Sequence, residues 1–366
     1  MKVIAKGYYG MGGNIAVLVT AIMLAKRLNA KLVVDWEEGV YGVADRDIFQ
    51  HLFDYPLNDI SLKYDDGAKV WPPAWQEFYK KTMPYRVVGG VNLSNISTDL
   101  AKEFGINNLK EKFNTVIISR DSSWWHWPEF KEESEHVVRS LKPSAHILAR
   151  INKYELGDNA IAVHFRHGNG EPTVVPPDIN WFFSQVDSFI RQSPTSKVLV
   201  CTDCLRVLHK FQERYGDKVI STDKSYLGLG KGAMHCNESE IDRLYSAEEA
   251  IVDIWSMGRC KYFVGSKSFF TGVALKLASA ARQNIKVWSP IHRSHRQEPD
   301  KVPVSDDPWA RECFFKAGMY TDGVFIKFLE RGVSFYYLYD ELASFDSLEN
   351  IDLGAVQAEL NIKRLY

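Results

Sequence analysis

Residues 160–171 read AIAVHFRHGNGE, an apolar run that passes directly into a polar loop containing two glycines. Residues 160–165 have the length and the continuous apolar content of a strand that is buried on both faces. In open α/β sheets, ligands bind outside the carboxyl ends of the strands. The stretch therefore predicts a parallel α/β unit with a ligand site directly after residue 165.

Strands and helices alternate along the chain after this stretch, with short links between them. This order predicts a parallel sheet that is covered by helices on both faces. The expected helices are 181–192, 205–215, 247–258 and 269–280, and the expected strands are 197–202, 218–221, 261–265 and 284–288.

A second βαβ unit is expected at the N-terminus. It has a strand over 2–7, a glycine-rich loop over 8–13, a helix over 14–28 with Asn14 as its N-cap, and a strand over 31–36. The chain therefore contains two α/β halves.

The length of 366 residues also favours two domains, at about 100–200 residues each. We expect an N-terminal α/β domain over 1–153 and a second α/β domain over 154–299. The remaining residues, 300–366, are expected to form a linker and a C-terminal tail that packs back on the rest.

The composition argues against several classes of partner. The formal net charge is -1, with 45 basic and 46 acidic residues, whereas a protein that binds duplex nucleic acid is usually basic. The longest apolar run, 15–25, is shorter than the roughly 20 residues that span a bilayer, so we expect no transmembrane segment. Five cysteines are few and odd in number, which is typical of a reduced, cytoplasmic protein.

The loop after residue 165 has the side chains of an anion site. The guanidinium of Arg166 is always charged and can bind two phosphate oxygens at once. Gly168 and Gly170 allow a ligand to approach the backbone closely, and His167 and Asn169 add hydrogen-bond donors. The alternative is an ordinary surface turn at the end of a strand.

Two carboxylates are candidates for chemistry or recognition. Glu171 lies just beyond the anion loop and could be a general base, with an ordinary exposed glutamate as the alternative. Asp253 lies on the helix that begins with the capping box Ser246–Glu249. Its carboxylate could accept two adjacent N–H donors, as on a guanine edge, and the alternative is a solvated helix carboxylate.

Residues 265–268, Gly-Ser-Lys-Ser, link a strand to a helix. The N–H groups of a helix N-terminus and the hydroxyls of Ser266 and Ser268 can form an anion cradle, whereas Ser268 could instead be a simple N-cap. At the end of another strand, Asp203 could cap a helix or contact a ribose.

A metal site is not expected. The sequence has no H-E-x-x-H motif, and its one D-x-D match, Asp45–Asp47, lies in the half opposite the Arg166 loop. Cys201 and Cys204 form a C-x-x-C pair that stands alone, with no second pair in the sequence, so neither a redox nor a metal role is expected for it.

Five tryptophans lie in irregular segments of the first half. They could pack between loops, since an indole buries a large area, or they could stack on the apolar face of an acceptor sugar. They are Trp71, Trp75, Trp124, Trp125 and Trp127.

Several of these pieces resemble one family. Residues 163–171, VHFRHGNGE, resemble the H-x-R loop of the bacterial nodulation α1,6-fucosyltransferases and are similar to the H-x-R-R loop of the mammalian core α1,6-fucosyltransferase. His167 stands where the mammalian enzyme has a second Arg. The other segments that resemble this family are Gly10–Gly12, Ala25–Leu28, Val34–Trp36, Leu199–Asp203, Ala250–Ile254, Gly258–Cys260 and the turn with Ser266 and Ser268.

The resemblance implies a GT-B-type glycosyltransferase, with two Rossmann-like α/β domains facing across a cleft. It implies an inverting transfer of L-fucose from GDP-fucose, without metal or other cofactor, to an oligosaccharide or lipo-oligosaccharide acceptor, such as α1,6 to N-acetylglucosamine. The alternatives are a non-catalytic GDP-sugar or glycan-binding protein on the same scaffold, and a transferase for another GDP-sugar.

The resemblance also implies roles for single residues. Arg166 would hold the β-phosphate, with His167 and Asn169 near it, and Glu171 would be the base. Asp253 would pair with guanine. The remaining donor-binding candidates are Ser266 and Ser268 near the phosphates and His164, which could equally be a core histidine.

Overall fold

A computed structural model describes residues 1–37, 39–43, 48–55, 67–71, 75–76, 106–118, 130–156, 159–169, 176–228, 242–266, 268–278 and 284–288. Within them the chain forms two compact α/β units. The first comprises the described residues within Met1–Glu155, Ile241–Arg259 and Ser268–Ala281, and the second comprises those within Leu156–Glu240, Cys260–Lys267 and Arg282–Tyr366.

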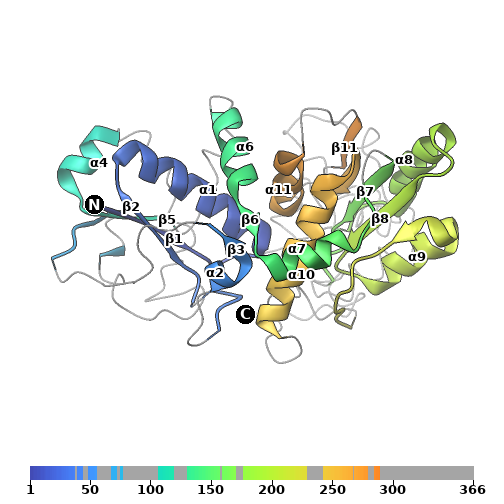
Figure 1. Ribbon diagram of the computed structural model, residues 1–366, viewed down its shortest axis with the longest axis horizontal. Coiled ribbons are helices and arrows are strands. Elements are labelled where there is room, and N and C mark those ends of the chain that lie inside the picture. The colour runs from blue at the N-terminus through green and yellow to red at the C-terminus, as the bar shows by residue number, and fades with distance from the viewer. Residues whose placement is uncertain are drawn as a thin grey trace, which may run out of the picture. The chain divides into compact units, whose positions relative to one another are not determined.

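The first unit is built on a parallel sheet with the strand order β2-β1-β5-β4 (Figure 1). Its helix α1 packs on β1 and β2 and against α6 and α11. The elements of the sheet and its main helix are β1 (Lys2–Lys6), α1 (Met11–Leu28), β2 (Lys31–Asp35), β4 (Val70–Trp71) and β5 (Thr115–Ile118).

The remaining elements of the first unit surround this layer. Two short strands, β3 directly after α2 and β6 between α6 and α7, pair in antiparallel fashion. These elements are α2 (Ile48–Leu52), β3 (Phe53–Asp54), α4 (Ile106–Lys112), α6 (Lys131–Ser140), β6 (Lys142–Pro143), α7 (Ala145–Asn152), α10 (Arg243–Arg259) and α11 (Phe269–Leu277).

The helix α1 begins at Met11, three residues before the expected N-cap. Asn14 is buried inside the helix and accepts a hydrogen bond from the backbone N–H of Tyr9 (2.8 Å), so the prediction that Asn14 caps the helix is wrong. The first turn of this helix contains Gly12, where a Cβ would lie 2.3 Å from the backbone nitrogen of Phe270. Glycine at this position lets α1 pack directly against the backbone of α11.

The same helix is long and apolar enough to cross a membrane by length and composition alone. In the structure, however, 89% of that window is buried. This is the burial expected of the central helix of a globular core.

The second unit is a five-stranded parallel sheet with the order β11-β10-β7-β8-β9. From β7 the chain builds β8 and β9 on one side, and it later adds β10 and β11 on the other. Its elements are β7 (Ala160–Phe165), α8 (Ile179–Gln192), β8 (Lys197–Thr202), α9 (Leu205–Tyr215), the 3-10 turn η4 (Gly216–Lys218), β9 (Val219–Ile220), β10 (Tyr262–Ser266) and β11 (Asn284–Trp288).

The central strand of this sheet, β7, is buried along its whole length, as its apolar run predicts. Ile161, Val163 and Phe165 alternate along it and pack in one core with α8, β8 and α9. The period of two puts these side chains on the same face of the sheet. The strand thereby holds the start of the Arg166 loop in a rigid frame.

The division of the chain differs in one respect from the domains expected from the sequence. From the sequence, the helices over 247–258 and 269–280 are expected in the second domain, over 154–299, because they alternate with its strands. In the structure both helices, α10 and α11, group with the first unit. The expected linker and tail, 300–366, lie outside the described residues.

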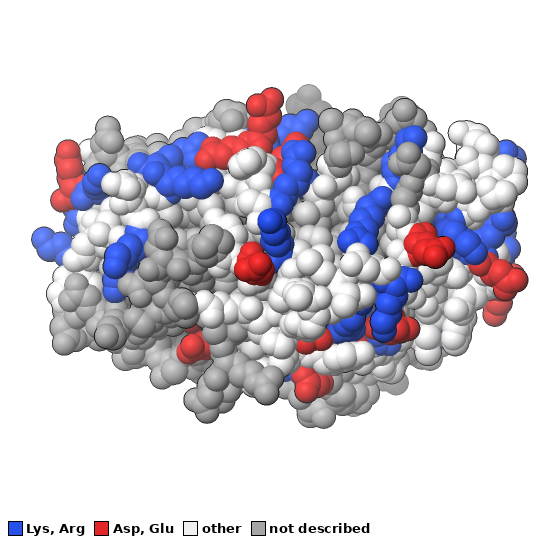
Figure 2. Space-filling model, viewed as in Figure 1, with Lys and Arg blue, Asp and Glu red and all other residues white. Residues whose placement is uncertain are grey.

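Charged side chains of both signs are interspersed over the face shown in Figure 2. On this face the described part of the chain presents no broad area of a single sign. This distribution agrees with the nearly balanced charge of the whole sequence.

Candidate active site at the Arg166 loop

The Arg166 loop leaves β7 at the point where the strand order of the second sheet reverses, between β7 and β10. The backbone N–H of Arg166 donates to Oγ of Ser266 (3.1 Å), the last residue of β10. The same hydroxyl donates to the carbonyl oxygen of His164 (3.3 Å). The carboxyl ends of the two strands are therefore tied together at the switch point, which is the ligand-binding position in open α/β sheets.

Asp203, directly after β8, holds the other side of the loop. Its two carboxylate oxygens accept the backbone N–H groups of His167 (2.7 Å) and Gly168 (2.8 Å). Gly168 and Asn169 have φ angles of 78° and 45°, so the loop turns through the left-handed region that glycine and asparagine tolerate best. The chain thus bends sharply around one carboxylate.

The ionised form of Asp203 is the one that fits this arrangement. Burial of the carboxylate raises its pKa, but the positive charge of Arg166 and the two backbone N–H donors lower it by more. The pKa of Asp203 therefore lies below its ordinary value, and the side chain stays ionised at neutral pH. The sequence alone offered only helix capping or a ribose contact for this residue.

His167 and Asn169 are buried inside the loop, each with 1% of its surface exposed. Nδ1 of His167 accepts the backbone N–H of Asn169 (3.1 Å), which places the proton of a neutral ring on Nε2. The amide group of Asn169 donates to the carbonyl of Gly228 (2.9 Å). Both side chains stabilise the shape of the loop, and their contact with a phosphate stays a prediction. His164 is buried in β7.

The two expected serines have different positions. Ser266 is buried at 4% exposure and ties the loop to β10, as described above. Ser268 is the N-cap of α11, and its Oγ accepts the backbone N–H of Thr271 (3.1 Å). The capping alternative therefore holds for Ser268.

Asp253 lies on α10, in the first unit, and is 3% exposed. The alternative of a solvated helix carboxylate is therefore wrong. The expected capping box is also wrong, because α10 begins at Arg243 and Ser246 lies inside the helix. Asp242 is the residue that caps it, and its carboxylate accepts the backbone N–H of Tyr245 (2.9 Å).

Trp71 and Trp75 lie in the core of the first unit, with 3% and 0% of their surfaces exposed. The indole of Trp75 stacks on Tyr8, with ring centroids 6.2 Å apart, and Nζ of Lys6 lies 5.7 Å from its ring. The expectation that these two indoles bind an acceptor sugar is therefore corrected to core packing. The other three candidates, Trp124, Trp125 and Trp127, lie outside the described residues, as does Glu171.

Comparison with known proteins places these observations in one family. The sequence profile of nodulation protein Z (NodZ) matches residues 1–275. Nodulation protein Z of Sinorhizobium fredii is 29% identical over 165 residues, which cover 40% of this chain and 48% of that protein. The match therefore spans about half of that relative. Nodulation protein Z of Azorhizobium caulinodans is 26% identical over 288 residues, covering 72% of this chain and 84% of that protein.

A solved structure supports the same grouping at the level of the fold. The fucosyltransferase NodZ from Bradyrhizobium superposes with a TM-score of 0.50 at 20% identity, over 76% of this chain and 93% of that one. The expected GT-B-type fold of two Rossmann-like α/β units is thereby confirmed. With a family profile that matches three quarters of its length, this chain belongs to the nodulation protein Z family.

Proposed function

We propose that this protein is a fucosyltransferase that moves L-fucose from GDP-fucose to an oligosaccharide or lipo-oligosaccharide acceptor. The observation that carries the proposal is the Arg166 loop, which is fixed at the switch point of the second sheet by Ser266 and Asp203. Membership of the nodulation protein Z family supports it, and so does the name of the Bradyrhizobium relative, a fucosyltransferase.

The chemistry proposed for the loop concerns the leaving group. When the bond between the sugar carbon and the β-phosphate oxygen breaks, negative charge grows on the departing GDP. The guanidinium of Arg166 would bind these oxygens, and the hydrogen bonds at its backbone hold it in place before the reaction. Donors that are preorganised in this way typically contribute about 3–4 kcal/mol each to the stability of the transition state.

The proposed transfer is a direct displacement that inverts the sugar carbon and needs no metal on the pyrophosphate. An acceptor hydroxyl would attack the sugar carbon from the face opposite to GDP, and its proton would pass to a base. Glu171 is the base that the sequence offers, because it follows the phosphate loop directly. In this scheme the permanent charge of Arg166 replaces the cation that other transferases use.

Asp253 is the residue proposed for recognition of guanine. A guanine edge presents two adjacent N–H donors, and a carboxylate can accept both. Asp253 is 3% exposed, so water would not compete strongly for its carboxylate. A buried acceptor of this kind discriminates strongly against bases without the matching donors.

The proposal is tested by measuring GDP release and fucose incorporation with GDP-fucose, in the presence and absence of oligosaccharides that contain N-acetylglucosamine. We expect release that depends on acceptor, and a slower rate or none with GDP-mannose. Tight binding of GDP-fucose without release of GDP under any acceptor would contradict the proposal and favour a non-catalytic GDP-sugar-binding protein.

A further inference from the structure

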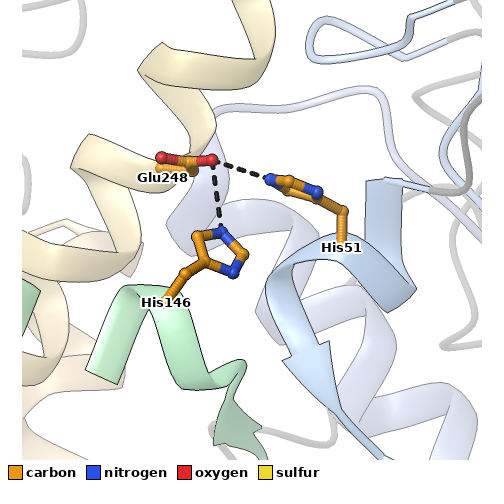
Figure 3. Close-up of side chains that lie close together, drawn as sticks. All are labelled: His51, His146 and Glu248. Carbon is orange, nitrogen blue, oxygen red and sulfur yellow. Dashed lines mark hydrogen bonds and ion pairs between the residues drawn. The ribbon is translucent and has the colours of Figure 1, made fainter. Parts of the chain in front are cut away.

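Three side chains from separate helices of the first unit converge on one point (Figure 3). His51 lies on α2, His146 on α7 and Glu248 on α10. Nε2 of His51 lies 2.7 Å and Nε2 of His146 lies 3.3 Å from Oε1 of Glu248. One nitrogen from each ring and one carboxylate oxygen all lie within 4.8 Å of one another.

The hydrogen bonds behind His146 fix which of its nitrogens faces the carboxylate as an acceptor. Oγ of Ser144 donates to the carbonyl of His51 (2.8 Å), so it must accept from Nδ1 of His146 (3.1 Å). A neutral His146 ring therefore carries its proton on Nδ1 and directs the lone pair of Nε2 towards Oε1 of Glu248. Two lone pairs that face each other at 3.3 Å repel unless a cation lies between them.

The neighbours of Glu248 orient its carboxylate. Nη1 of Arg150 binds Oε2 at 2.6 Å, which leaves Oε1 for the two imidazoles. Partners of this kind, on Nδ1 of a histidine and on the second oxygen of a carboxylate, are those that typically orient metal ligands.

We propose that His51, His146 and Glu248 bind one divalent transition-metal ion, with zinc as the best chemical match. Two imidazoles and a carboxylate are a common ligand set for zinc, at metal–ligand distances of about 2.0–2.2 Å. In a tetrahedral site such ligands lie about 3.3 Å apart, which is the separation of His146 from Glu248. To reach this geometry, the separation of His51 from Glu248 must open by about half an ångström, and the two imidazole nitrogens, which lie within 4.8 Å of each other, must come closer. Rotations of the partly exposed histidine side chains can make both changes.

Exposure of the three side chains leaves room for a fourth ligand. The side chain of Glu248 is 14% exposed, that of His51 29% and that of His146 47%. Water can therefore complete the tetrahedron from the side of His146. The ion would join α2, α7 and α10, whose ligands are 95 to 197 residues apart in the sequence. Such an ion would stabilise the packing of these three helices. Its ligands are none of the residues proposed to bind GDP-fucose.

The proposal is tested with the full chain, stripped of metal by a chelator and titrated with zinc in a calorimeter. We expect one zinc ion per chain. Loss of a residue that only orients a ligand typically costs about 10- to 100-fold in metal affinity. H146Q and E248Q, which each remove a ligand, should therefore weaken binding at least about tenfold. H136Q is the matched control, because His136 is an exposed histidine on α6 of the same unit, and its affinity should equal that of the parent.

Thermal melting supplies a second readout that does not depend on any activity. Zinc should raise the midpoint of the parent and of H136Q, because a ligand that binds only the folded chain stabilises it, and at the same zinc concentration it should raise that of H146Q by less. If E248Q is already destabilised without metal, the result for H146Q decides whether the site exists, because the side chain of His146 is about half exposed and its replacement should not affect folding. No zinc binding by the parent, or equal binding by H146Q and the parent, would overturn the site and leave a cluster bridged by protons alone.

Discussion

The substitution D203N tests whether one carboxylate shapes the Arg166 loop. In the parent, Asp203 accepts two backbone N–H groups at 2.7 and 2.8 Å beside the charge of Arg166. The amide of the variant has one acceptor oxygen, and its NH2 group opposes the second backbone N–H. A hydrogen bond to a charged group contributes about 1.5–3 kcal/mol, so we expect the free energy of unfolding to fall by about 2–3 kcal/mol.

The same substitution should slow transfer by more than it weakens donor binding. Arg166 precedes the two N–H groups that lose their partner, so its guanidinium would be displaced, and a misplacement of about 1 Å can cost about 100-fold in rate. We expect kcat to fall by about 10- to 100-fold. D217N, at an exposed carboxylate on η4, is the control and should behave as the parent.

The stability difference between D203N and the parent should also depend on pH. Because the pKa of Asp203 lies below its ordinary value of 3.8 in the folded chain, its contribution is complete above that value and is lost as the pH falls through the lower folded value. Urea unfolding should therefore give a constant difference at neutral pH that shrinks below about pH 4. A difference under about 0.5 kcal/mol at pH 7, with kcat within threefold of the parent, would refute the reasoning.

Two further substitutions test the first unit. D253N should weaken GDP binding and reduce the preference for GDP over ADP and UDP, because its amide presents a donor to a donor on guanine; calorimetry that gives equal GDP affinity in both proteins would exclude this role. W75A should lower the free energy of unfolding by about 3–5 kcal/mol, because a fully buried indole is removed; a variant that melts with the parent but has a raised acceptor KM would restore Trp75 as a sugar-binding residue.

Local sequence patterns are sufficient to predict much of the second unit. The apolar run 160–165 predicts β7 with its observed bounds, because a strand that is buried on both faces needs no other signal. Strand ends gather at one edge of a parallel sheet, so the proximity of Arg166 to the end of the strand at Ser266 also follows from the pattern. The role of Asp203 does not, because a carboxylate directly after a strand can equally cap the next helix or contact a ligand, and the pattern does not show that it accepts the N–H groups of His167 and Gly168.

Long-range packing explains what the sequence did not predict. The first turn of α1 packs on a distant segment, where Gly12 meets the backbone at Phe270, more than 250 residues away in the chain. The return of α10 to the first unit likewise depends on tertiary contacts, such as the bond from Arg243 to the carbonyl of Gly42 (3.0 Å). The histidine cluster at Glu248 has no local spacing that a motif could capture.

The most direct test of the central claim compares fucose transfer and GDP affinity in R166A and the parent. The account predicts that kcat falls by about 10²–10³, the usual cost of removing one preorganised donor, while the affinity for GDP changes much less. R191A, at an exposed arginine on α8, should match the parent in both measurements. A kcat for R166A within threefold of the parent would contradict the claim that this loop stabilises the departing GDP.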